Sequence, residues 1–295
     1  MKKYDLPFSG FLIALAASFF FGLWPVAVRG VYAAGGDVGF ALSSMTWARA
    51  LMMALFCLVT RRPLFATREA VMQGIVGGFF QAVCLATLYA ALKTLSGPIV
   101  IIILFSSTLM LLFFMAWRGE IRLDVATVAT TCGALAGLGF VLDLWHAQNA
   151  ATIKGIVLAF VAALAAMSRL YVYGKQVKLR HPIVVGAESF LVAAAMLSPV
   201  LFLGVHPPVT WMGGAYAVLG CVAVTLGSFA MFYGIELLGS FKLSLFSKME
   251  PVFTSIFSTL LLGEVLKSSQ YAGIAMVLGS LALYQVFEQR RIKAA

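Results

Sequence analysis

Residues 97–117 read GPIVIIILFSSTLMLLFFMAW, a run of 21 residues without a charged side chain. An α-helix rises about 1.5 Å per residue, and the hydrocarbon core of a bilayer is about 30 Å thick. A helix formed by this run is therefore long enough to cross a membrane. Charged residues stand close to both of its ends, at Lys93 and Arg118. The run predicts a membrane-spanning helix.

Nine further apolar segments of similar length are separated from one another by clusters of charge, proline and glycine. The hydrocarbon core holds no water, so each segment must satisfy its own backbone hydrogen bonds, and a helix does this. The alternating pattern of a membrane β-barrel is absent from the sequence. We predict an all-α membrane protein with ten transmembrane helices, at 8–31, 39–60, 71–92, 97–117, 124–142, 153–173, 183–205, 211–238, 243–262 and 269–287.

The composition supports this prediction and excludes several classes of protein. Of the 295 residues, 62% are hydrophobic and 11% are charged, against about 25% charged in a soluble domain. A chain of this kind is not a soluble enzyme, a disordered protein or a nucleic-acid binder, although its net charge is +10. The four cysteines lie inside apolar runs without CxxC spacing, so we expect no metal site and no cofactor.

The distribution of Lys and Arg predicts how the chain is oriented. With the N-terminus inside, 14 of the 21 basic residues fall at inner span ends, 4 at outer ends and 3 within spans. Cytoplasmic loops of membrane proteins are enriched in Lys and Arg. We therefore predict a multi-pass protein of the inner (plasma) membrane with both termini in the cytoplasm.

The chain repeats itself at an offset of 144 residues. Tyr89 then falls on Tyr233, and Gly119-Glu120 falls on Gly263-Glu264, where each Gly-Glu pair closes an apolar span. Two repeats of five spans follow, which we place at 1–147 and 148–295, with the long connection 143–152 between them. An odd number of spans forces the two repeats into opposite orientations, an arrangement common among secondary transporters. Duplication in a channel or a structural protein is the alternative.

The second half contains the strongest family pattern. Residues 233–284 include Pro251, the sequence Leu262–Glu264, and the spaced glycines Gly273 and Gly279. With these residues the segment resembles the C-terminal repeat of EamA-type members of the drug/metabolite transporter superfamily.

The first half looks like the partner repeat, with Trp24-Pro25 in its first span and Arg49 in its second. The resemblance implies a ten-helix transporter that exports amino acids or other metabolites, closest in look to bacterial exporters of the YddG type. One departure is that Ser107 stands where the second half has Pro251.

Ionisable groups inside spans are costly and mark candidate sites. Arg49 lies near the middle of its span, and we interpret it as a structural group that binds backbone carbonyls; a place on the substrate path is the alternative. Lys248 and Glu250 lie two residues apart, so they should not pair with each other. Pro251 should kink or unwind the helix near Ser247, which favours a place for this segment on the path. The alternative is that Lys248 extends to the inner headgroups and Glu250 is structural.

Other charged groups are interpreted as structural. Arg169 and Glu188 occupy the inner parts of consecutive spans and are predicted to pair. Glu120 and Glu264 end their spans, where we expect them to cap helices or fix loops.

Polar and aromatic residues inside spans are candidates to line a substrate path, because an unpaired polar group is unfavourable in hydrocarbon. Aromatic residues at the membrane interface are the alternative explanation for the Trp and Tyr among them. Together with the segment at Ser247, the candidates are Trp24, Gln81, Tyr89, Ser106, Ser107, Ser228, Tyr233, Ser247, Lys248, Glu250 and Pro251.

These observations predict a secondary transporter that exports small metabolites, most plausibly aromatic or other apolar amino acids, by alternating access. We expect a central cavity lined by spans one to four and six to nine. The expected partners are a small-molecule substrate and the lipid bilayer, and the expected unit is a monomer. A transporter of another solute class, such as a drug, nucleoside or sugar-type metabolite, and a substrate-permeable channel are the alternatives. An enzyme is disfavoured because all three histidines lie in loops and form no catalytic motif.

Overall fold

The computed structural model describes residues 8–121, 123–146, 152–199, 205–263 and 265–294. Within these residues the chain is almost entirely helical and contains no strand. The helices are α1 (Phe8–Ala33), α2 (Val38–Val59), α3 (Arg68–Leu92), α4 (Gly97–Phe105), α5 (Ser107–Trp117), α6 (Val125–Val141), α7 (Ile153–Gln176), α8 (Pro182–Leu197), α9 (Trp211–Leu238), α10 (Ser240–Phe246), α11 (Met249–Leu262) and α12 (Ser268–Ala294), with a short 3₁₀ turn at Leu144–His146.

The twelve helices make ten spans, because α4 and α5 follow each other within one span and α10 and α11 within another. Seven spans in the described residues are long and apolar enough to cross a membrane, and α6 and α8 are shorter apolar helices. The predicted all-α membrane fold with ten spans is confirmed. The seventh span was expected to reach residue 205; its helix α8 ends at Leu197, and residues 200–204 lie outside the described residues.

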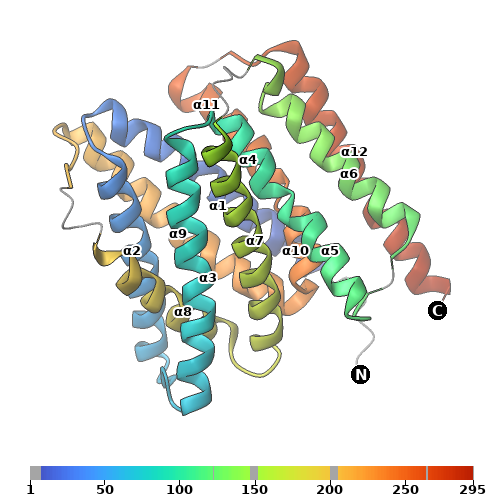
Figure 1. Cartoon of the computed structure of the whole chain (residues 1–295), viewed down its shortest axis with the longest axis horizontal. Coiled ribbons are helices and arrows are strands. Elements are labelled where there is room, and N and C mark those ends of the chain that lie inside the picture. Colours follow the sequence, from blue (N-terminus) through green and yellow to red (C-terminus); the bar gives the residue numbers. More distant parts are fainter. Residues whose placement is uncertain (1–7, 122, 147–151, 200–204, 264, 295) are drawn as a thin grey trace.

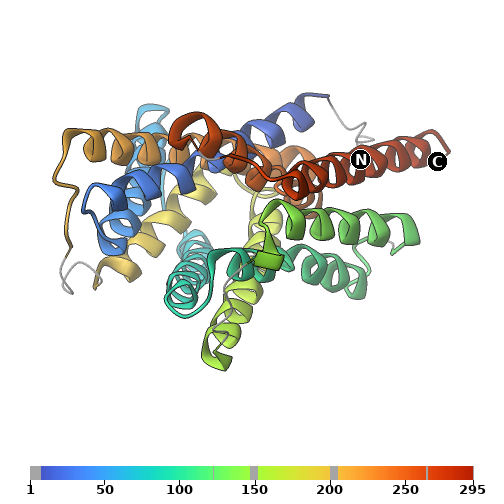
Figure 2. The ribbon, with the colours of Figure 1, turned by 90° about the horizontal axis from the view of Figure 1, so that it is seen from above.

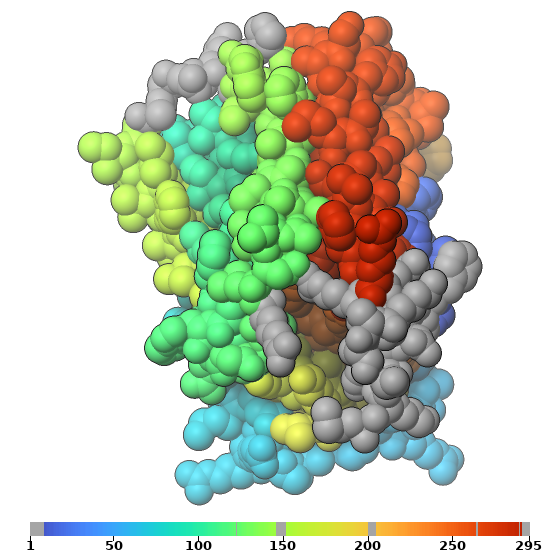
Figure 3. All heavy atoms as spheres, turned by 90° about the vertical axis from the view of Figure 1, so that its right-hand side faces the viewer, coloured from blue at the N-terminus to red at the C-terminus, as the bar shows by residue number. Residues whose placement is uncertain are grey.

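The spans pair in the way that two inverted repeats require. α1 packs against α9 as α7 packs against α3, and α2 packs against α9 as α8 packs against α3. Equivalent spans of the two halves also meet, α2 with α8 and α6 with α12. The α6–α12 pair stands side by side at one edge of the bundle (Figures 1, 2 and 3). The predicted boundary at 147/148 lies outside the described residues.

The loops between the spans lie at two ends of the bundle. The predicted inner end holds the α2–α3 and α7–α8 loops, at the bottom of Figure 1. The predicted outer end holds the α1–α2 and α8–α9 loops. Because the chain makes ten crossings, α1 begins and α12 finishes at the same end.

Short polar residues start many of the helices. Five begin after an Asp or Thr whose side chain accepts a hydrogen bond from the backbone N–H three residues later, which satisfies one of the free donors of the first turn. These capping residues are Asp37, Thr67, Asp124, Thr152 and Thr210.

The repeated Gly-Glu pairs mark equivalent helix ends. Gly119 follows α5 and Gly263 follows α11, and both have a φ of +71°. This left-handed conformation ends a helix and costs glycine little, because glycine has no Cβ. The internal repeat is therefore visible in backbone geometry as well as in sequence.

Spans four and nine are both interrupted near their middle. In span nine the break falls at Ser247–Lys248, and Pro251 lies in the first turn of α11, where its missing N–H is not needed. The kink predicted near Ser247 is confirmed. Span four is interrupted at Ser106 although it lacks the proline. The Ser106 hydroxyl donates to the carbonyl of Ile103 at 2.6 Å, a local bond of the kind that bends helices.

Candidate functional site

A cavity of about 180 Å³ lies between the two halves, in the middle of the bundle. Its described lining comes from α1–α5 and α7–α11 and includes no residue of α6 or α12. This is the expected lining by spans one to four and six to nine. Eight of the eleven predicted path residues line it: Trp24, Gln81, Tyr89, Ser107, Ser228, Ser247, Lys248 and Glu250.

Three predicted path residues do not line the cavity. The Ser106 hydroxyl is turned back onto its own helix, as described above. Pro251 is buried in the first turn of α11. The Tyr233 ring lies 6.0 Å, edge to face, from the ring of His181, toward the predicted inner end. Tyr89 and Tyr233 are equivalent in sequence, yet only Tyr89 reaches the cavity, because inverted repeats place equivalent residues at opposite ends.

The cavity wall approaches the predicted outer end, and an aromatic cluster packs on its inner side. Tyr89 on its wall lies three residues before Leu92, the last residue of α3. On the inner side, the wall residue Phe190 packs 5.8 Å from Phe232, which packs 4.8 Å from Tyr173. All three rings are buried. This cluster extends from the cavity wall at Phe190 toward the predicted inner end.

Lys248 connects the two halves at the cavity wall. Its Nζ donates to the Thr108 hydroxyl at 2.5 Å and lies 4.2 Å from the ring centre of Phe105. The Thr108 and Ser244 hydroxyls are 2.7 Å apart. Lys248 is 1% exposed, so its side chain does not extend to a surface. The interrupted span nine thus presents its cation to the interrupted span four.

Sequence reasoning missed Thr108, Phe105 and Phe190 as neighbours of the charged groups. Thr108 could have been found, because it continues the polar run Ser106-Ser107 inside an apolar span. The two phenylalanines gave no signal, since the chain contains 24 of them.

Glu250 is the one carboxylate on the described wall. It lies within electrostatic reach of Lys248 and Arg169. No ion pair within 4.0 Å joins it to either of them. The expectation that Lys248 and Glu250 would not pair is confirmed.

Arg49 and Arg169, which we expected to be structural, both reach the cavity wall. Arg169 Nη1 donates to Gln81 Oε1 at 2.5 Å, and the Arg49 guanidinium lies 4.6 Å from the ring centre of Phe190. The predicted pairing of Arg169 with Glu188 is wrong. The α7–α8 loop brings Arg180 next to Glu188 instead, while Arg169 points toward α3.

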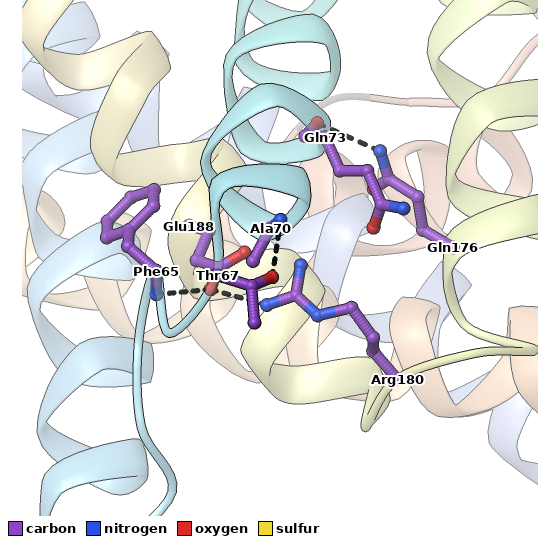
Figure 4. A network of polar contacts seen from close by, with 7 residues as sticks. All are labelled: Phe65, Thr67, Ala70, Gln73, Gln176, Arg180 and Glu188. Carbon is purple, nitrogen blue, oxygen red and sulfur yellow. Dashed lines mark hydrogen bonds and ion pairs between the residues drawn. The ribbon is translucent and has the colours of Figure 1, made fainter.

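Glu188 forms a buried network at the predicted inner end (Figure 4), in which its Oε2 atom has no hydrogen-bond partner. Its Oε1 accepts from the backbone N–H of Phe65 at 2.6 Å and from Arg180 Nη2 at 2.5 Å. Its side chain is fully buried. Nearby, Gln176 Nε2 donates to the carbonyl of Gln73 at 2.9 Å, which links α7 to α3.

Two loop carboxylates have pKa values below their usual range. Burial alone would raise the pKa of Glu120, but hydrogen bonds from Lys175 and Tyr171 lower it. Burial would also raise the pKa of Asp37, but hydrogen bonds from the Phe40 N–H and from His206 outweigh it. Both carboxylates are therefore ionised at neutral pH. Glu264, predicted to act like Glu120, lies outside the described residues.

A second hollow lies between α1, α11 and α12. Gln285 is the one polar residue on its described wall. It offers a polar solute an amide and no charge. No group of three His, Cys, Asp or Glu side chains that could hold a metal ion occurs in the described part of the chain.

A bundle of ten spans in two inverted halves, with a mainly apolar cavity between them that carries a few charged side chains, is an arrangement common among secondary transporters. Residues 153–285 match the profile of the EamA-like transporter family. The second half of the chain is therefore similar to an EamA-like transporter domain, and this similarity, together with the apolar spans, suggests a multi-pass membrane transporter of small solutes.

A solved crystal structure supports the fold. It superposes on 95% of this chain and 99% of its own length, with a TM-score of 0.80 and 19% sequence identity. At this identity the likeness shows the fold alone. No curated protein sequence matches the chain.

Proposed function

We propose that this protein exports small organic solutes, with aromatic or other apolar amino acids as the leading candidates, by alternating access through the central cavity. The observation that carries the proposal is the cavity wall itself. A buried lysine from the interrupted span of one half is held by Thr108 from the interrupted span of the other half. A solute bound there would contact both halves at once.

The size and chemistry of the cavity support a solute of about amino-acid size. Sites for drug-sized ligands are commonly about 300–1,000 Å³, and this cavity is about 180 Å³. Phe21, Trp24 and Phe105 give it an aromatic wall, while Lys248 and Glu250 give it charges of both signs. Such a wall suits a solute with one apolar part and one charged part.

The symmetry of the fold supports alternating access. The aromatic rings of Tyr173, Phe190 and Phe232 pack against one another on the inner side of the cavity, where they could close the path. Because the halves are inverted repeats, rocking one half against the other can exchange the open end for the closed one. The protein then needs no covalent reaction and no cofactor.

Other solute classes fit the same architecture, and a channel is the second candidate because its path would also run between the halves. A carrier saturates when all its sites are occupied, and a channel does not at comparable concentrations. We place the protein in the inner membrane with both termini in the cytoplasm, on the distribution of Lys and Arg. A monomer contains the complete cavity.

The test is flux of radiolabelled amino acids, nucleosides and sugars in proteoliposomes containing purified protein. We expect saturable flux of aromatic or branched amino acids. Lys248→Ala and Tyr89→Phe should reduce flux per folded molecule at least fivefold, because both side chains lie on the wall. Lys154→Ala, at an exposed position at the start of α7, is the matched control and should leave flux unchanged. Normal flux in Lys248→Ala would place the path elsewhere.

A further inference from the structure

The cavity wall has an excess of positive charge. Three cationic side chains line it, Arg49, Arg169 and Lys248, against one carboxylate, Glu250, which leaves two positive charges unbalanced. In the described part of the chain, none of the three cations has a carboxylate within ion-pair distance. Arg49 and Arg169 also lie close enough for their charges to interact.

The two arginines have unused hydrogen-bonding capacity. Arg49 is 9% exposed, and its only hydrogen bond in the described structure is a long one of 3.4 Å to the Thr46 hydroxyl. Arg169 binds Gln81 through Nη1. The Nε of each arginine is buried without a partner. A buried donor without an acceptor costs about 1–3 kcal/mol, and more when the group is charged.

Glu188 shows how the same fold neutralises a buried charge internally, although its Oε2 atom has no hydrogen-bond partner. Its Oε1 receives both a backbone N–H and an arginine from nearby segments. The wall arginines receive neither a carboxylate nor a full set of acceptors. An arginine remains protonated in proteins, so loss of its proton does not remove the cost. An anion from outside the chain would supply both the missing acceptor and the missing negative charge.

On the proposed function, we infer that the transported solute is an amphipathic organic anion whose carboxylate is bound by Arg49 and Arg169. The planar guanidinium group donates two parallel hydrogen bonds to a carboxylate, which suits the unused donors on this wall. The rest of the solute packs on the aromatic side chains. A zwitterion supplies the carboxylate but adds an ammonium group, for which Glu250 is the one carboxylate acceptor on the described wall. An aryl or branched carboxylate without an ammonium group matches the charge balance better.

The test uses three solutes with the same aromatic ring and different charge. Phenylpropanoate is an anion, phenylalanine is a zwitterion, and phenylalaninamide is a cation. Their binding to the purified wild-type protein is measured by calorimetry or ligand-induced thermal stabilisation, and each is then tested as a competitor of flux. We expect phenylpropanoate to bind at least tenfold more tightly than phenylalanine, and phenylalaninamide not to bind.

Variants test whether the binding of phenylpropanoate depends on the wall arginines. Arg169→Gln should weaken the binding of phenylpropanoate at least tenfold and reduce the preference of the protein for phenylpropanoate over phenylalanine. Arg169→Lys, which keeps the charge but loses the two-pronged donor, should weaken it less and guards against misfolding of the first variant. Arg68→Gln, at an exposed position at the start of α3, is the control.

Two outcomes contradict the inference in different ways. If phenylalanine binds and is transported as well as phenylpropanoate or better, the charge inference is wrong and the proposed function stands. If none of the three solutes binds or moves, while the protein is folded, both the inference and the proposed amphipathic solute are wrong.

Discussion

At the scale of single residues, the distinction that matters most is between buried charges that have an ion-pair partner in the chain and those that have none. The Oε1 atom of Glu188 accepts from the α2–α3 loop and from the oppositely charged Arg180, while its Oε2 atom has no partner. Arg49 and Arg169 lie close enough for their positive charges to interact, and the Nε atom of each has no hydrogen-bond acceptor. The arrangement at Glu188 is typical of a structural contact, and the arrangement at Arg49 and Arg169 is typical of a ligand-binding site.

The Glu188 network should contribute measurably to stability. Glu188→Gln removes the charge and leaves Arg180 without its buried partner, which should lower the free energy of unfolding by about 3 kcal/mol. Lys175→Ala removes the more exposed ion pair with Glu120 and should cost under about 1 kcal/mol. Thermal unfolding of both variants in the same detergent compares the two pairs. Equal shifts would show that burial of Glu188 does not matter.

The Asp37 carboxylate should give a local dependence of stability on pH. Its pKa is lowered from the ordinary value of 3.8 in the folded protein. Its contribution is therefore complete above that ordinary value and is lost as the pH falls through the lower, folded value. Between pH 5 and pH 3 the wild type should lose more stability than Asp37→Asn, which cannot titrate. Parallel loss in both proteins, measured as melting temperature against pH, would contradict this.

Only part of the site could be predicted from the sequence. An ionisable residue in an apolar run can be recognised from a single sequence. Lys248 and Glu250 were therefore predicted to lie on the path, and Arg49 was recognised as a buried charge, although it was interpreted as structural. Their partners were not, because partners depend on which faces of distant helices meet. Arg169 and Glu188 illustrate this: they lie on consecutive spans, yet a loop residue, Arg180, is closer to Glu188.

At the scale of helices, the fold depends on close contacts between small residues. On α12, a Cβ added at Gly273 would lie 2.5 Å from the backbone nitrogen of Val141 and 2.7 Å from the carbonyl of Gly137. On α3, a Cβ at Gly78 would lie 2.7 Å from the carbonyl of Ser189. Gly78 and Gly273 therefore mark faces where the backbones of two helices touch.

The contact between α6 and α12 can be tested within one helix. Gly273→Ala forces the backbones apart and should destabilise the protein by about 1–3 kcal/mol. Gly279→Ala, on the same helix, meets nothing within 4 Å and should be neutral or slightly stabilising. The readout is the fraction of monodisperse folded protein after heating in detergent. Similar behaviour of the two variants would mean that α6 and α12 do not pack through Gly273.

The existence of the helices was predictable because composition and length dictate them. The break in span nine was predictable because Pro251 indicates an interrupted helix. The break in span four was not, because Ser106 interrupts the helix through a hydroxyl contact that serines do not always make.

At the scale of the whole molecule, the spans pack against one another as the predicted internal repeat requires, and inversion explains the position of the cavity. Ten crossings and the distribution of Lys and Arg together predict the topology. Reporter fusions after Arg62 and after Lys267 should report opposite sides of the membrane, with Arg62 in the cytoplasm. The same side for both fusions would contradict the ten-span topology.

The central claim, that this chain is a carrier with one solute site open to one side at a time, is tested most directly by counterflow. Proteoliposomes are loaded with an unlabelled solute that the protein binds, and a trace of the same radiolabelled solute is added outside. If the protein is a carrier, the label should accumulate inside for a time above its equilibrium level. A site that has released label inside then binds mostly unlabelled solute before it returns, so little label leaves. The overshoot should be greatly reduced in Lys248→Ala. Simple equilibration without an overshoot, with uptake that does not saturate, would identify a channel and contradict the account.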